Sequence, residues 1–304
     1  AWLFAFLAAV CLTAVFGVHR GIERLSTCLM PIFFLLMIGL AAYSLLLPGS
    51  EAGLAYLFQF SWSTVTPQAI LNAMGFTFFS LSLGAGVLVT YGAYVNKSTR
   101  LPSAAMWVAI LALQAAILAG LVIMPAVFAY GLEPDAGPGL VFITLPMIFA
   151  QLSGGSVVAV IFYFCLFVAA LTSAVSLLEV AVAFLQNECR FSRRAAVFLC
   201  FAALFILGSV SALSFGPWSD CLIFGRGFFD FLDYVCTNFL MTINGLAVAF
   251  VVGWKAWPKA MKELSTCSPE NGVVTKGTLS AIGFGLRWLA PLMVLASCWQ
   301  GLEA

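Results

Sequence analysis

The chain has 304 residues, of which 63% are hydrophobic and only 8% are charged. A water-soluble domain carries about 25% charged residues, so this composition and a mean hydropathy of +1.10 exclude a soluble globular protein. The formal net charge of +1 shows no bias towards nucleic acid or an acidic partner.

Apolar segments about 20 residues long, the length that crosses a bilayer as a helix, recur along the whole chain. We place eight of them, at 2–18, 30–47, 69–95, 104–130, 156–186, 195–213, 228–254 and 280–299. Helices are expected because a helix satisfies its own backbone in lipid. The prediction is an all-α membrane protein with one transmembrane domain over 1–304 and outer loops at 48–68 and 131–155. The chain begins inside an apolar run, so we expect it to be part of a longer protein.

Lysine and arginine residues gather in alternate loops, which indicates the cytoplasmic side. Eleven of the thirteen lie in segments 19–29, 96–103, 187–194 and 255–279. The first loop is therefore expected inside, and both ends of the chain outside. In the outer loop 131–155, the apolar run 140–150 is too short to span and predicts a re-entrant or capping helix.

The segment 69–95 contains a polar, glycine-rich break. Two serines and two glycines fall in the seven residues 80–86, and glycine weakens a helix by about 1 kcal/mol. An unwound stretch at this depth must face protein or a water-filled cavity, and transporters use such stretches to bind ions and substrates. The alternative is close helix packing through small residues.

Hydroxyl side chains form a second cluster at Thr172, Ser173 and Ser176, on one broad helix face. Hard cations such as Na⁺ prefer oxygen ligands, which makes this a candidate ion site. Hydroxyls that bond back to their own helix are the alternative. A third feature is the pair Gly21 and Pro31, which brackets the inner end of a span and predicts a helix end that unwinds easily.

Three carboxylates are notable. Asp230 and Asp233 lie near the outer end of a span, where a solvated role and a functional one are both open. Glu179 lies deep in 156–186 and needs a partner or a proton, since intramembrane carboxylates are functional candidates. The one histidine, His19, lies in a basic loop and no phosphate-binding G-x-x-x-x-G-K motif occurs, so neither an enzyme nor an ATP-driven pump is expected.

In combination, these features resemble the neurotransmitter:sodium symporter family, in its bacterial branch. The resemblance covers nearly the whole chain, with motifs in the family's order. The matching strings are Gly21-Ile-Glu-Arg to Met30-Pro31, Phe78-Phe-Ser-Leu-Ser-Leu-Gly84, Thr90-Tyr-Gly92, Ala119-Gly120 to Pro125-Ala126, Gly137-Pro-Gly-Leu-Val-Phe142, Leu145-Pro146 and Ala169-Ala-Leu-Thr-Ser173.

The resemblance implies the inverted-repeat fold of the bacterial leucine transporter, present here in part. The eight segments would correspond to the family's fourth to eleventh spans, with the first three missing. The family's first span supplies half of its substrate and ion sites.

Carried over by position, the resemblance implies a second sodium site on the Ala169 carbonyl and the Thr172 and Ser173 hydroxyls. Ser80 would serve the first sodium site. Substrate contacts would come from Phe79, Ser82, Ala85, Ser173, Ala174 and Leu177. Asp233 would be the outer-gate carboxylate, and Gly21 and Pro31 would belong to an inner-opening motif.

The chain departs from the family at the first sodium site. Ala112, or Leu111, lies where the family has Asn or Asp, and Phe76 replaces a glutamine. Ala115 or Ala116 lies at the chloride position. A carrier coupled to one Na⁺ through the second site follows, and the small Ala85 and Ala174 leave room for a bulky apolar substrate.

The sequence thus predicts a sodium-coupled symporter for amino acids, apolar ones above all, that works by alternating access as a multi-pass protein of the cell's inner membrane. Its expected partners are an amino acid and lipid, with a homodimer left open. Two rival hypotheses are an inactive remnant or interaction subunit, and a proton-coupled amino-acid permease with Glu179 as proton site.

Overall fold

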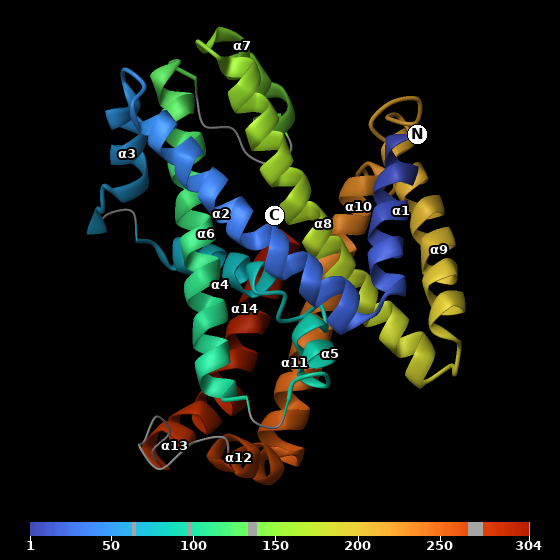
Figure 1. Ribbon diagram of the computed structural model, residues 1–304. Helices are drawn as coiled ribbons and strands as arrows, with labels where there is room; N and C mark the ends of the chain where they lie inside the picture. Colours follow the sequence, from blue (N-terminus) through green and yellow to red (C-terminus); the bar gives the residue numbers. More distant parts are fainter. Residues whose placement is uncertain (63–64, 97–98, 133–138, 267–275, 304) are drawn as a thin grey trace. The chain divides into compact units, whose positions relative to one another are not determined.

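The computed structural model describes residues 1–62, 65–96, 99–132, 139–266 and 276–303, which form helices joined by turns and loops (Figure 1). Segments labelled η are π-helical. In chain order the helices are α1 (Trp2–Val15), η1 (Val18–Glu23), α2 (Arg24–Leu45), α3 (Ser50–Phe58), α4 (Pro67–Ser80), α5 (Val87–Gly92), α6 (Leu101–Ala129), η3 (Leu140–Thr144), α7 (Leu145–Gln151), α8 (Gly155–Asn187), α9 (Arg193–Leu213), α10 (Phe228–Tyr234), η4 (Val235–Leu240), α11 (Met241–Phe250), η5 (Val251–Lys255), α12 (Trp257–Thr266), α13 (Lys276–Phe284), η6 (Gly285–Leu289) and α14 (Ala290–Glu303).

Six continuous helices in the described part of the chain are long and apolar enough to cross a membrane. They are Val18–Leu45, Leu101–Ala129, Gly155–Asn187, Arg193–Leu213, Phe228–Lys255 and Leu279–Ala296. No more than 22% of the residues in any of these apolar windows are buried, so apolar side chains cover their outer faces. Such a surface suits lipid and would be unfavourable in water. The expectation of an all-α membrane protein is confirmed.

The other two predicted spans differ from a continuous helix. Segment 69–95 is interrupted between α4 and α5, as its glycines and serines predicted. Segment 2–18 contains only the 14-residue helix α1, because Gly17, with a φ of +89°, separates α1 from the π-helical turn η1. The length expected for that span was therefore an overestimate.

The chain forms two compact units. The first unit comprises Ala1–Cys11, Ser63–Ala109 and Leu177–Ala304, and the second comprises Leu12–Trp62 and Ile110–Ser176. Helix α8 passes from the second unit into the first.

In the second unit, the core lies among α2, α6, α7 and the first turns of α8. The run 140–150 forms η3 and α7, which together make a 12-residue apolar helix, as predicted. Its side chains Leu145, Ile148 and Phe149 are buried in this core. The predicted outer loop 48–68 also contains a helix that was not predicted, α3. Residues 63–64 and 133–138 of the two predicted outer loops lie outside the described residues.

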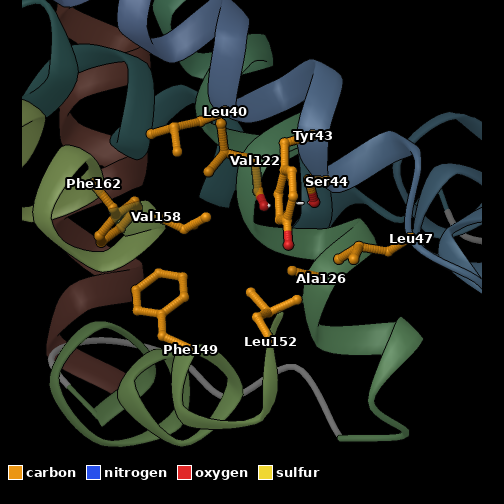
Figure 2. Close-up of a pocket in the computed structure, with 10 residues that line it drawn as sticks. All are labelled: Leu40, Tyr43, Ser44, Leu47, Val122, Ala126, Phe149, Leu152, Val158 and Phe162. Carbon is orange, nitrogen blue, oxygen red and sulfur yellow. Dashed lines mark hydrogen bonds between the residues drawn. The ribbon is translucent and has the colours of Figure 1, made fainter. Parts of the chain in front are cut away.

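Two hydroxyl groups tie this core together through backbone carbonyls. The Ser44 hydroxyl donates to the Val122 carbonyl at 2.9 Å, and the Tyr43 hydroxyl donates to the Ser153 carbonyl at 3.0 Å. Figure 2 shows both side chains beside a small apolar cavity of about 10 Å³. A space of this size holds at most one water molecule. It is therefore too small to be an amino-acid site.

In the first unit, α14 packs against both α4 and α11. Near the chain's beginning, the Phe4 ring makes edge-to-face contacts with Phe201 and Phe205 of α9. In η5, which follows α11, the Gly253 carbonyl accepts from the Arg287 Nε of η6 at 2.6 Å. In the first unit, α14 therefore lies against the first half of the interrupted helix, α4, and against α11.

Candidate functional site

The interruption between α4 and α5 is the most irregular backbone among the apolar helices. Helix α4 begins on a Thr66 cap, whose hydroxyl accepts from the Ala69 amide at 3.1 Å. It ends at Ser80, and residues 81–86 make a series of turns. Ser82 adopts a left-handed φ of +51° and Gly86 a φ of +77°. The predicted break is confirmed as a feature of the fold.

Four residues of the predicted substrate and ion sites lie at this break or next to it. Phe79 and Ser80 close the last turn of α4 and are exposed, with half of the Phe79 surface accessible. Ser82 and Ala85 lie within the turns and are half-buried. The Ser82 amide donates back to the Phe79 carbonyl at 2.9 Å. This local bond connects the end of α4 to Ser82, the first residue of the break with a left-handed φ.

The hydroxyl cluster lies on α8, as predicted. The Thr172 hydroxyl donates to the carbonyls of Val168 at 3.0 Å and Ala169 at 3.1 Å, and the Ser176 hydroxyl donates to the Thr172 carbonyl at 2.9 Å. The bonds to the helix's own backbone, named as the alternative, are therefore present at two of the three positions. A hydroxyl that donates its proton keeps its oxygen lone pairs, so these bonds leave oxygens that can accept a cation.

The predicted site residues divide between the two units. The first unit contains Phe79, Ser80, Ser82, Ala85, Leu177 and Asp233. The second unit contains Gly21, Pro31, Ala169, Thr172, Ser173 and Ala174. Residues 169 to 177 nevertheless share one continuous helix, α8. On it Ser173 and Leu177 are exposed and one turn apart. Asp233 is also exposed, and its carboxylate accepts weakly from the Thr237 hydroxyl at 3.5 Å.

Gly21 has a packing role that spacing did not reveal. It is buried in η1, and a Cβ on it would lie 2.2 Å from the Thr13 carbonyl oxygen. The inner end expected to unwind is a π-helical turn in this structure. Pro31 lies inside the 22-residue helix α2 and is exposed.

Glu179 has a partner that the sequence did not identify. Its carboxylate is fully buried and pairs with both terminal nitrogens of Arg193, at 2.5 and 3.1 Å. The Tyr94 hydroxyl adds a long donor at 3.4 Å. From the sequence, Arg193 was counted among the basic residues of a loop. It lies 14 positions after Glu179 and on a different helix, so the spacing along one helix could not connect the two. The paired guanidinium compensates the buried negative charge.

The structure describes the residues that were expected to depart from the family at the first sodium site. Ala112 is half-buried on α6, and Phe76 is an exposed aromatic side chain on α4. Within the described residues, no group of three or more His, Cys, Asp or Glu side chains could hold a metal ion. Any cation here would depend on hydroxyl and carbonyl oxygens, the ligands that α8 offers.

Comparison with known proteins gives a consistent result. Residues 1–276 match the model of the Sodium:neurotransmitter symporter family. An uncharacterized sodium-dependent transporter of Haemophilus influenzae is 37% identical over 92% of this chain and 60% of its own length. Another, of Bacillus subtilis, is 35% identical over 95% of this chain and 64% of its own length.

Among solved structures, the crystal structure of MhsT in complex with L-phenylalanine superposes with a TM-score of 0.85 at 40% identity. It covers 98% of this chain, and this chain covers 66% of MhsT. The chain thus spans between 60 and 66% of the length of these relatives.

Proposed function

This chain belongs to the sodium:neurotransmitter symporter family, and from that premise we propose that it is part of a sodium-coupled symporter for amino acids. It is a multi-pass membrane protein of a transporter family and not an enzyme. The observation that carries the proposal is the break at 81–86, which contains Ser82 and follows Phe79 and Ser80. Unwound backbone at this position supplies carbonyls and amides to an ion or a substrate.

The sodium site of this proposal is the second one, on α8. Its ligands are the Ala169 carbonyl and the hydroxyls of Thr172 and Ser173. The observed bonds from Thr172 orient its hydroxyl proton towards the backbone, so its oxygen lone pairs face away from the helix. Because Ala112 lies at the expected ligand position of the first site, the proposal includes neither a first sodium site on Ser80 nor a chloride site.

Binding of the substrate is proposed for Phe79, Ser82, Ala85, Ser173, Ala174 and Leu177. The two alanines leave volume for a large apolar side chain, and the solved relative bound to L-phenylalanine supports that size. Competition of unlabelled amino acids for uptake tests this point. Glycine or alanine competing better than leucine or tryptophan would contradict it.

Sodium coupling is tested by uptake into proteoliposomes, with the chain expressed together with the coding sequence that flanks it. Thr172→Val keeps the side-chain shape and removes the ligand oxygen. We expect its KM for Na⁺ to rise about tenfold, the equivalent of ~1.4 kcal/mol. Thr77→Val is the matched control, because that hydroxyl also bonds to its own helix, at 2.7 Å from the Ala73 carbonyl. An equal response of both variants would contradict the proposed site.

The proton-coupled hypothesis has less support. Its proton site, Glu179, already has a guanidinium on both carboxylate oxygens. Uptake that persists in Na⁺-free buffer under an imposed pH gradient would favour it. No uptake by the flanked protein under either gradient would favour the inactive or interaction role.

The remaining parts of the proposal concern the gate and the setting. Asp233 would act at the outer gate, and Gly21 and Pro31 in inner opening. The protein would reside in the inner membrane as one transmembrane domain with outer loops 48–68 and 131–155. Its partners would be an amino acid and lipid. Cross-linking in the membrane tests whether it forms a homodimer.

A further inference from the structure

The side chain of Asn244 on α11 makes a hydrogen bond to the backbone of the break. Its Nδ2 donates to the Gly84 carbonyl at 2.7 Å, although 160 residues separate the two in the chain. Asn244 is exposed, whereas Gly84 is buried at the centre of the turns 81–86. Both belong to the first unit.

The backbone of α11 also lies close to the backbone of the break. A Cβ on Gly84 would be 2.2 Å from the Met241 carbonyl oxygen, so only a residue without a side chain permits this approach. The Cβ position of Gly86 lies 3.8 Å from the Asn244 Nδ2. One residue further along α11, the backbone of Gly245 meets the Phe78 ring. The contact therefore includes Phe78 near the end of α4 and two residues of the turns, Gly84 and Gly86.

The hydrogen bond from Asn244 pairs a backbone carbonyl that the helix no longer pairs. Residues that leave helical geometry lose the regular i to i+4 bonds, and a polar backbone group left unpaired away from water is unfavourable. An asparagine amide offers two donors, of which one is used here on Gly84. An oxygen in the same position would repel the carbonyl, so the donor orientation of the amide is required.

We propose that Asn244 is a positioning residue, which holds the break at 81–86 in the shape that binds the substrate. Its amide acts through the backbone of Gly84 and does not itself contact the substrate. Without it, the break samples more conformations, and binding must select the competent one, which weakens apparent affinity. The transport consequence rests on the proposed function, whereas the effect on the backbone does not.

The first measurement needs no transport activity. Hydrogen exchange of the amides at 81–88 is followed in the purified protein, again expressed with its flanking sequence. In Asn244→Ala we expect exchange there to accelerate about fivefold to tenfold, which corresponds to ~1 to 1.4 kcal/mol for one hydrogen bond. Asn244→Asp should do the same at neutral pH, because it keeps the shape and loses the donor. Amides of α9 should be unchanged.

The second measurement is uptake kinetics. Asn244→Ala and Asn244→Asp should raise the KM for the amino acid about fivefold to tenfold. The maximal rate should stay within about twofold, because the break would still form once substrate has bound. Asn244→Gln, which keeps the donor, should recover part of the loss. Asn72→Ala, at an exposed asparagine of α4, is the matched control.

Three results would overturn the proposal. One is unchanged exchange at 81–88 in both donor-free variants. Another is a fall of the maximal rate with an unchanged KM. The last is faster exchange throughout the first unit, which would indicate a general structural role. If the unaltered protein shows no uptake, the proposed function fails, while the exchange measurement still decides the role of Asn244.

Discussion

Replacing Arg193 by methionine removes the guanidinium from a fully buried carboxylate. In the structure two arginine nitrogens reach the two oxygens of Glu179, at 2.5 and 3.1 Å, and a third bond of 3.2 Å reaches Gln186. Removing one partner of a buried ion pair costs about 3–5 kcal/mol, because the other charge stays behind without compensation. About a fifth of the Arg193 side chain is accessible, so we take the lower end, about 3 kcal/mol.

The assay is thermal unfolding of the purified protein. At about 2–4 °C per kcal/mol, Arg193→Met should lower Tm by at least about 6 °C. Arg194→Met is the matched control, because the neighbouring arginine is exposed. The double variant Glu179→Gln with Arg193→Met removes the buried charge as well and should recover most of the loss. An Arg193→Met protein as stable as the control, or a double variant no more stable than the single one, would refute this reasoning.

Two further predictions concern packing in the second unit. Gly21→Ala places a Cβ 2.2 Å from the Thr13 carbonyl oxygen and should destabilise by about 1–3 kcal/mol, whereas Gly39→Ala, with open space around the new Cβ, should be neutral or slightly stabilising. Equal Tm values for the two variants would contradict this interpretation of the close approach. Ser44→Ala removes the 2.9 Å bond to the Val122 carbonyl and should lower stability by about 1 kcal/mol. An unchanged denaturation midpoint would show that this bond contributes nothing.

Local patterns in the sequence were enough to predict the helices and the break. Length and apolarity decide where a helix can cross lipid, since the bilayer requires both, and six of the predicted spans are continuous helices. The break at 81–86 was predictable because the seven residues 80–86 contain two glycines and two serines, which weaken a helix regardless of its neighbours. The apolar run 140–150 is too short to cross a bilayer, and this length predicted the short helix Leu140–Gln151.

Tertiary structure alone decided which residues meet. Nothing in the spacing connects Glu179 with Arg193, which begins the next helix after a turn, or Asn244 with Gly84, 160 residues earlier. The requirement for glycine at positions 21 and 84 likewise comes from backbone atoms of another helix. Local propensity acts over a few neighbouring residues, whereas these contacts depend on how helices pack. The sequence therefore showed where the chain must unwind, and the packing of α11 showed what holds the unwound segment in place.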